Sequence, residues 1–256
     1  MPQWDPTTYL EYADERGRPF VDLIARVPTE PRTIVDLGCG PGNLGGVLRS
    51  RWPQADIVGV DSSVEMIDRA RQNDSTSGTE YVLDDLATWR PEMPVDLIVS
   101  NAAFQWVSDQ LEIIPRLREY VAPGGVLAFQ VPDNYDEPSH VLLRGLAADP
   151  RFVDHVGDIE GSRGVAPRTY LELLADDDWH LDVWGTTYLH VLPGDDPVFA
   201  WIRGTGARPY VQALPDRLRA EFEADYRAAL RAAYPKRTYG TVLPFPRTFV
   251  VAKRRT

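Results

Sequence analysis

The sequence predicts an α/β fold, built from repeated βαβ units around a mostly parallel sheet. Two observations lead to this fold class. Between Thr33 and Val131, short β-branched runs alternate with longer helix-like segments, which is the pattern of strands joined by crossover helices. A glycine-rich stretch at 36–42 directly follows the first of these runs and precedes a helix-like segment, an order typical of nucleotide-type binding sites.

Each strand predicted in this core is short and rich in Val, Ile and Leu. The runs cover residues 33–37, 56–60, 81–83, 96–99 and 126–131. Before them, residues 6–27 are expected to form two helical pieces broken at Gly17, with Pro19 in the first turn of the second piece. These two pieces are a candidate lid over the core.

The alternation of strand-like and helix-like segments stops after Val131. A mixed, loop-containing stretch reaches about Asp178, and a strong strand is predicted at 183–191. A final strand is predicted at 248–252. Between these strands, residues 215–234 have the pattern of an amphipathic helix, and its apolar side consists of Leu218, Phe222, Tyr226, Leu230 and Ala233.

A length of 256 residues suits one large α/β domain or a core with a cap, and it can bury a sizeable hydrophobic core. We expect a single domain over residues 1–256. Its core would cover about 30–131 and the strands at about 183–192 and 247–253, and its cap elements would be 1–29, 132–180 and 193–246.

The composition narrows the possible partners. Lys and Arg number 27 against 38 Asp and Glu, so the net charge is −11, which disfavours nucleic acid and anionic membranes as partners. One cysteine, Cys39, cannot form an internal disulfide, and no apolar run reaches the roughly 20 residues needed to cross a bilayer. The first residues lack the cationic start and apolar stretch of a signal peptide. We therefore expect a cytoplasmic protein, with a monomer favoured.

Acidic residues accompany three successive predicted strands. Asp36 lies in the glycine loop, Asp61 follows the second strand and Asp85 follows the third. These carboxylates are expected at one edge of the sheet, where open α/β sheets bind ligands. They suit a cofactor with an amine, a ribose diol and an adenine amine, and they suit a pyrophosphate badly. The alternatives are that the loop is an ordinary tight turn between a strand and a helix, and that Asp61 is a helix N-cap.

Dinucleotide binding is further disfavoured by two observations. In a Gly-x-Gly-x-x-Gly pattern counted from Gly38, the third glycine is replaced by Asn43. A dehydrogenase that uses a Tyr/Lys pair is also hard to build, because no lysine precedes Lys236.

The loop 36–42, Asp61, the pair Asp85 and Leu86 and the segment 100–102 together resemble the class I S-adenosylmethionine-dependent methyltransferases. The resemblance implies a Rossmann-like, mostly parallel seven-stranded sheet with an antiparallel last strand, flanked by helices and carrying helical cap insertions. It implies S-adenosyl-L-methionine as the cofactor. It also implies the cofactor-binding residues, which are Asp36, Gly38, Cys39, Gly40 and Gly42 at the methionine part, Asp61 at the ribose, Met66, Asp85 and Leu86 at the adenine, Asn101 and Ala102 near the methionine end, and Ser62.

Further segments resemble one subgroup of that family, the methyltransferases of trans-aconitate. They are 4–6, 9–10, 15–19, 101–106, 131–138, 184–190, 205–209 and 245–247, so the resemblance runs from the first residues to the last strand. It weakens at 149–166, a stretch that could alter the cap. The resemblance implies a carboxyl O-methyltransferase whose substrate is a small tricarboxylate and whose product is a monomethyl ester.

Such a substrate needs concentrated positive charge, and Arg pairs with carboxylates bidentately. The candidate substrate-binding arginines are Arg16, Arg18, Arg203, Arg208 and Arg247. An antiparallel last strand would place Arg247 at the ligand edge, and the segment after Val191 would bring Arg203 and Arg208 there. The alternative is that these arginines form surface or interdomain ion pairs.

Further substrate-binding candidates are Gln105, Trp106, Asn134, Tyr188 and His190. Trp106 could equally belong to the core, and His190 could be a buried structural histidine. No general base is assigned, because a carboxylate is already ionised at neutral pH. No metal is assigned, because the histidines show no metal-ligand spacing with carboxylates or Cys39. Two alternatives stay open: methylation of a quinone or polyketide hydroxyl, and cofactor binding without turnover.

Overall fold

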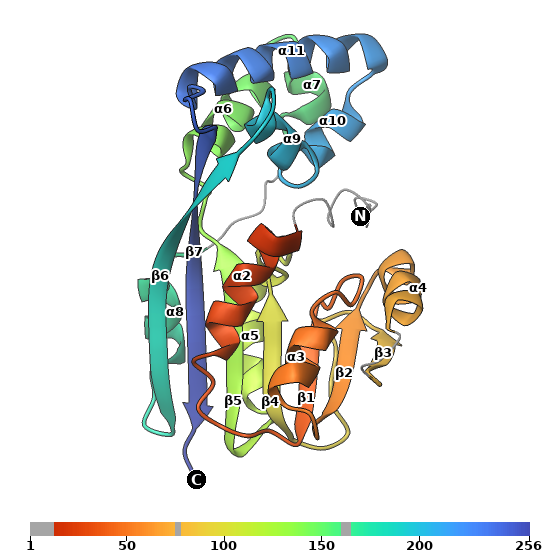
Figure 1. Cartoon of the computed structure of the whole chain (residues 1–256), viewed down its shortest axis with the longest axis vertical. Coiled ribbons are helices and arrows are strands. Elements are labelled where there is room, and N and C mark those ends of the chain that lie inside the picture. The colour runs from red at the N-terminus through yellow and green to blue at the C-terminus, as the bar shows by residue number, and fades with distance from the viewer. Residues whose placement is uncertain (1–12, 75–77, 160–164) are drawn as a thin grey trace.

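The computed structural model describes residues 13–74, 78–159 and 165–256, with side chains from Gly17 onward. Within these residues, one seven-stranded sheet has the order β3-β2-β1-β4-β5-β7-β6 (Figure 1). Its strands are β1 (Thr33–Leu37), β2 (Asp56–Asp61), β3 (Glu80–Leu83), β4 (Val95–Asn101), β5 (Val121–Pro132), β6 (Trp179–Leu192) and β7 (Thr241–Arg254). Neighbouring strands are parallel except at β7, which is antiparallel to both β5 and β6. The predicted fold class, with its antiparallel last strand, is confirmed.

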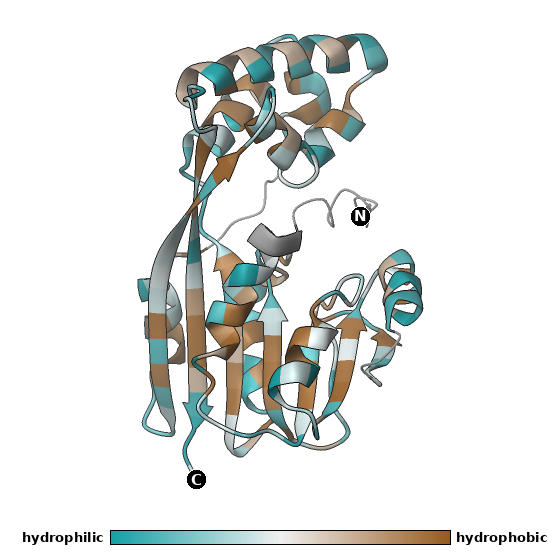
Figure 2. Cartoon of the chain, in the orientation of Figure 1, coloured by the Kyte–Doolittle hydropathy of each residue, from teal (hydrophilic) through white to brown (hydrophobic). Residues whose placement is uncertain are grey.

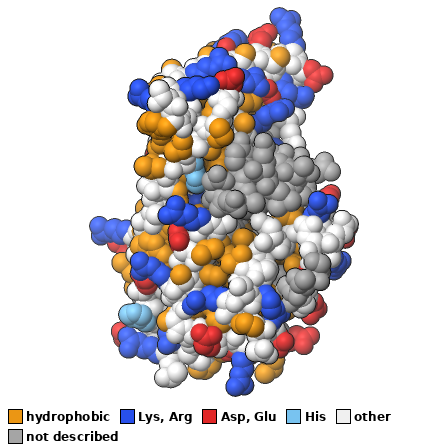
Figure 3. Space-filling model, viewed as in Figure 1, with side chains coloured by type: hydrophobic (Ala, Val, Ile, Leu, Met, Phe, Trp, Pro, Cys, Tyr) orange, Lys and Arg blue, Asp and Glu red, His pale blue; other side chains and the backbone are white. Residues whose placement is uncertain are grey.

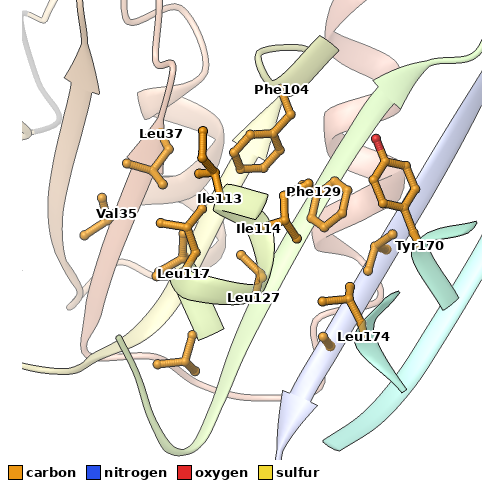
Figure 4. Close-up of a cluster of buried hydrophobic side chains, with 14 of the residues drawn as sticks. Val35, Leu37, Phe104, Ile113, Ile114, Leu117, Leu127, Phe129, Tyr170 and Leu174 are labelled. Carbon is orange, nitrogen blue, oxygen red and sulfur yellow. The ribbon is translucent and has the colours of Figure 1, made fainter. Parts of the chain in front are cut away.

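Helices cover both faces of the sheet, so the lower part of the molecule has three layers (Figure 1). The helices on the first face are α2 (Ala13–Ile24) and α3 (Gly45–Arg51). The second face carries α5 (Gln110–Arg118) and α8 (Pro167–Leu174), whose apolar side chains interlock with those of the strands (Figure 4). Because side chains alternate along a strand, Ile34 faces the first layer and Val35 the second. Figure 2 shows the parallel strands β1, β2, β4 and β5 apolar along most of their length.

The cap lies beyond the edge to which the parallel strands point (Figure 1). It contains α6 (Pro138–Ala147), α7 (Val153–Val156), α9 (Pro197–Arg203), α10 (Arg208–Ala213) and α11 (Asp216–Ala233), while α4 (Val64–Asn73) and the short helix η1 (Phe104–Trp106) follow β2 and β4. The predicted amphipathic helix is present as α11, and its residues Phe222, Tyr226 and Leu230 are buried in a separate cap core. Ala233, also predicted on the apolar side, is exposed because it ends the helix. The predicted cap range 132–180 also contains α8, which packs against the sheet instead.

The prediction of two helical pieces broken at Gly17 is wrong, because α2 continues through both Gly17 and Pro19. An interior proline costs a helix about 3 kcal/mol. Phe20, Leu23 and Ile24 are almost completely buried against the sheet, and each contributes roughly 1.5–3 kcal/mol of burial free energy. The packing of α2 therefore outweighs the local preference of proline.

The last two strands are longer than predicted. Strand β6 begins at Trp179 and β7 at Thr241, because they pair with each other over their whole length and carry the sheet into the cap. The sequence does not predict the start of β7, because Pro244 and Pro246 are unfavourable in the interior of a sheet. They are tolerated because β5 ends opposite Arg247, so the missing N–H groups face no neighbouring strand there.

Candidate functional site

The glycine loop after β1 is held open by backbone conformation. Gly38, Gly40 and Gly42 all have positive φ angles, of 76°, 56° and 74°. A Cβ at Gly38 would lie 2.3 Å from the Cβ of Ala103, and one at Gly42 would lie 2.9 Å from the Cβ of Ala70. Only glycine fits both positions without displacing the neighbouring chain. The interpretation of this loop as a close-approach turn therefore has a steric basis.

Asp61 ties this loop to the end of β2. Its Oδ2 accepts a hydrogen bond of 2.9 Å from the N–H of Gly40, and its Oδ1 accepts one of 2.9 Å from Ser63. The alternative that Asp61 caps the next helix is wrong, because Ser63 is the N-cap of α4 and accepts from the N–H of Met66. Burial raises the pKa of Asp61, and the backbone N–H donors oppose that rise.

Asp36 is a buried acid at the carboxyl end of β1. Only 4% of the residue is exposed, and its Oδ1 has no hydrogen-bond partner among the residues described. Burial, reinforced by the nearby carboxylate of Asp61, raises the pKa of Asp36 to about 7. A buried carboxyl oxygen that lacks a hydrogen-bond donor favours binding of a ligand with a positive charge.

The remaining cofactor candidates lie around the same edge. Asp85 is exposed, and its Oδ1 accepts from the N–H of Ala87 at 2.9 Å, while Leu86 is half-buried beside it. Met66 is buried on α4. Cys39 is buried, and burial raises the pKa of its thiol far above the ordinary value, so its sulfur is not a reactive thiolate. Ser62 is exposed between Asp61 and the N-cap of α4.

The segment after β4 has a strained turn. Ala102 has a positive φ of 55°, and its carbonyl accepts a 2.6 Å hydrogen bond from Nε2 of Gln105. Gln105 is 6% exposed, and its Oε1 has no partner within the described part of the chain. Gln105 therefore combines a fixed donor with a buried acceptor available to a ligand. Trp106 is 37% exposed, so it is not core.

A buried row of polar side chains crosses the sheet beside this turn. Asn101 on β4, Gln130 on β5 and Arg247 on β7 are exposed by 7%, 0% and 4%. Arg247 pairs with Pro132, the last residue of β5, so it lies at the predicted ligand edge although its strand begins six positions earlier. Asn134 is buried just beyond the same end of β5.

Tyr188 and His190 lie on β6 near Arg247. The hydroxyl of Tyr188 donates a 2.7 Å hydrogen bond to Asp22 of α2, and the guanidinium carbon of Arg18 lies 5.3 Å from the Tyr188 ring centre. Arg18 also pairs with Asp22 at 3.8 Å. His190 is buried and stacks on Trp201, with ring centres 4.8 Å apart. These contacts fasten α2 and the cap to β6.

The other candidate arginines come from α2 and the cap. Arg203 on α9 is exposed and pairs with Glu223 of α11 at 3.4 Å, which is the ion-pair alternative. Arg208 begins α10 in the cap and is half-buried. The side chain of Arg16 lies outside the described residues. Sequence reasoning missed Gln130, although a glutamine inside the apolar run 126–131 was an available signal. It also missed Asp22, for which the helix pattern gave no signal.

No described helix has the length and apolarity to cross a membrane. Likewise, no group of three or more His, Cys, Asp or Glu side chains within 13–74, 78–159 and 165–256 is arranged to hold a metal ion.

Comparison with known proteins identifies the family to which this fold belongs. Residues 9–180 match the protein family described as a methyltransferase domain. Solved structures of similar fold include the plantazolicin methyltransferase BpumL, with a TM-score of 0.55, 14% identity and coverage of 98% of this chain and 91% of that one. The YcgJ protein from Bacillus subtilis has a TM-score of 0.58 at 13% identity, over 94% of this chain and 99% of that one. The chain is thus a methyltransferase of the Rossmann-like class.

Curated relatives narrow the family further. A trans-aconitate 2-methyltransferase of Streptomyces avermitilis is 48% identical over 99% of this chain and 98% of the relative. One from Azoarcus sp. is 46% identical over 99% of this chain and the whole relative. The chain belongs to the trans-aconitate 2-methyltransferase family, which confirms the resemblance found in the sequence.

Proposed function

We propose that this protein transfers a methyl group from S-adenosyl-L-methionine to a carboxylate of trans-aconitate, giving a monomethyl ester and S-adenosylhomocysteine. The observation that carries the proposal is a separation of charge along one sheet face. The buried acid Asp36 lies on β1, and the buried guanidinium of Arg247 lies on β7. Three strand spacings separate these strands, about 14 Å, which leaves room for a cationic cofactor and an anionic substrate side by side.

The residues around β1 to β4 fit the cofactor. Asp36 supplies a buried acceptor without a partner among the described residues, as a cationic methionine moiety requires. The loop of Gly38, Gly40 and Gly42 allows close approach to the backbone. The proposal keeps the other cofactor contacts expected from the sequence: Cys39, Asp61, Ser62, Met66, Asp85, Leu86, Asn101 and Ala102. When bound, the cofactor supplies an electrophilic methyl group on a sulfonium.

The reaction needs positioning rather than proton transfer. A carboxylate oxygen attacks the methyl carbon in line, the C–O bond forms as the S–C bond breaks, and the bonding electron pair remains on sulfur. No proton is taken up or released, because the carboxylate is ionised and the product is a neutral ester. Opposite charges on substrate and cofactor cancel as the methyl group moves, so exclusion of water favours the reaction.

Arg247 is proposed to hold a carboxylate that does not react. Bidentate pairing of Arg with the reacting carboxylate would lower its nucleophilicity, so the pairing must fall on a spectator group. Gln105, Trp106, Asn134, Tyr188 and His190 would shape the space around the substrate, and Arg16, Arg18 and Arg208 would add charge from α2 and the cap. Arg203 is the least supported of the arginine candidates, because Glu223 already neutralises it.

The test is direct. The protein is mixed with methyl-labelled S-adenosylmethionine and trans-aconitate, and the label that base releases as methanol is counted. We expect label well above a reaction without trans-aconitate, and loss of that label in Arg247→Gln. No label above the control would overturn the proposal. A monomeric state and a cytoplasmic location remain predictions from the sequence.

A further inference from the structure

Gln130 links the two halves of the site through a chain of buried hydrogen bonds. Nη1 of Arg247 donates to Oε1 of Gln130 at 2.8 Å, and Nε2 of Gln130 donates to Oδ1 of Asn101 at 2.5 Å. Asn101 and Gln130 are direct partners in the β4 and β5 register. One completely buried carboxamide therefore touches both the cofactor-side amide and the substrate-side guanidinium.

The direction of this chain is fixed by chemistry. Arginine can only donate hydrogen bonds, so the group of Gln130 that faces Arg247 must be its oxygen. The NH2 group of Gln130 then faces Asn101, and the side-chain oxygen of Asn101 must accept its hydrogen bond. As a result, Nδ2 of Asn101 points away from Gln130, as a donor.

A backbone hydrogen bond also joins the end of β4 to β5 beside these side chains. The N–H of Ala102 donates to the carbonyl of Gln130 at 2.9 Å, directly after Asn101. The positive φ of Ala102 turns the chain away from β4 at this point. The side chain and the main chain of Gln130 therefore both act on the end of β4.

We infer that Gln130 is a positioning residue for both ligands. It holds the guanidinium of Arg247 for the substrate carboxylate, and it sets Asn101 as a donor toward a carboxylate oxygen at the methionine end of the cofactor. This inference rests on the proposed function for its substrate half. Its cofactor half depends only on binding of S-adenosylhomocysteine.

The test uses Gln130→Met, which keeps the length of the side chain and removes both hydrogen bonds. Leaving buried polar partners unsatisfied costs enough to change binding about tenfold. We expect the KM for trans-aconitate to rise about tenfold, and the Kd for S-adenosylhomocysteine, measured by calorimetry without substrate, to rise several-fold. Arg247→Gln should raise the KM for trans-aconitate and change the Kd of S-adenosylhomocysteine much less.

The matched control is Gln110→Met. Gln110 is also buried, and its Oε1 accepts a 2.6 Å hydrogen bond from Tyr170 on the opposite sheet face. We expect this variant to lower the Tm and leave both ligand constants within about twofold. If Gln130→Met behaves in the same way, Gln130 is only a packing residue and the inference is overturned.

A second variant keeps the inference testable if Gln130→Met does not fold. Gln130→Glu retains the shape and the acceptor for Arg247, but it presents an oxygen to Asn101 and forces that amide to turn over. We expect weaker binding of S-adenosylhomocysteine, and unchanged binding would refute the role of Gln130 in orienting Asn101. If the wild-type protein binds S-adenosylhomocysteine but does not methylate trans-aconitate, the proposed function fails while this cofactor test still stands.

Discussion

We predict that the buried carboxyl of Asp36 makes both cofactor binding and stability depend on pH. Burial raises its pKa to about 7, so the carboxyl of the unliganded protein is about half protonated at neutral pH. A cationic cofactor favours the ionised carboxylate and must therefore displace that proton. We predict that binding of S-adenosylhomocysteine, whose α-amino group is cationic, strengthens as the pH rises.

The size of the effect follows from the pKa. With a pKa of about 7, the ionised fraction of Asp36 falls from about nine-tenths at pH 8 to about one-tenth at pH 6. If only the ionised form binds well, the Kd should weaken about tenfold between those two values. Binding at pH 6 should release close to one proton for each ligand bound, and binding at pH 8 close to none.

Isothermal titration calorimetry measures both quantities. Titrations at pH 6, 7 and 8, each in two buffers with different heats of ionisation, give the Kd and the number of protons released. The control is Asp36→Asn, which should bind with the same Kd at all three values and more weakly than wild type at pH 8. Equal wild-type affinity at pH 6 and pH 8, or uptake of a proton, would refute the reasoning.

The same shift makes a prediction about stability. The folded pKa of Asp36 lies above the unfolded value of 3.8, so the folded state binds the proton more tightly. Protonation of Asp36 therefore contributes about 4 kcal/mol to the free energy of unfolding below pH 3.8, and this contribution is lost as the pH rises to about 7. Urea unfolding above pH 7 should therefore find unliganded Asp36→Asn more stable than wild type, and an equally stable variant would contradict a buried charge.

Three further predictions concern other sites. Arg247→Gln should raise the KM for trans-aconitate at least about tenfold and the Kd for S-adenosylhomocysteine less than about threefold. The exposed control Arg203→Gln should change neither constant. An equal rise of both constants in Arg247→Gln would indicate a structural role. Cys39 should not react with a thiol reagent until the protein unfolds, because burial raises its pKa, and rapid reaction of the native protein would contradict this. Burial, assisted by Arg144, lowers the pKa of His140 to about 4, so the free energy of unfolding decreases as the pH falls from 6.5 toward 4. Between pH 7 and pH 5, urea unfolding should show that wild type loses about 2 kcal/mol more of this free energy than His140→Gln. Equal losses in the two proteins would contradict the lowered pKa.

The core of the fold was predictable because its signals are local. The strands from β1 to β5 are apolar runs bounded by polar turns, and the predicted positions match the observed ones to within a few residues, apart from the earlier start of β5. The errors occurred where tertiary contacts override local preference. Burial of Phe20 and Leu23 keeps α2 intact through Pro19, and pairing with β6 extends β7 through Pro244 and Pro246.

The cofactor side of the site was more predictable than the substrate side. Asp36 and Asp61 lie at the carboxyl ends of the neighbouring parallel strands β1 and β2, so the sequence alone predicts that they share one edge of the sheet. The arginines come from the lid, the cap and the last strand, and their places depend on how distant segments pack. Arg247 is buried at the sheet edge, whereas Arg203 meets Glu223 in the cap, and no local pattern distinguishes the two.

Alternation along the strands explains why the same sheet face supplies both the core and the site. On that face, Ile34 precedes Asp36, Val99 precedes Asn101 and Ala128 precedes Gln130, each by two positions. The apolar member of each pair packs under α2 and α3, and the polar member reaches the edge. A change of register in any of these strands would therefore remove the site together with the core.

The net charge of −11 gives little information about a site built in this way. On the face seen in Figure 3, acidic and basic side chains are mixed over the surface. Elsewhere in the described residues too, charged side chains pair with each other, as Arg231 does with Asp196. Exposed charges of this kind are screened over about 8 Å at physiological salt. Asp36 and Arg247 are buried and screened much less, with the neutral amides of Asn101 and Gln130 on the strands between them. Under the proposed function, each ligand would respond to the nearest buried charge, and an acidic protein would attract a cation at β1 and a tricarboxylate at β7.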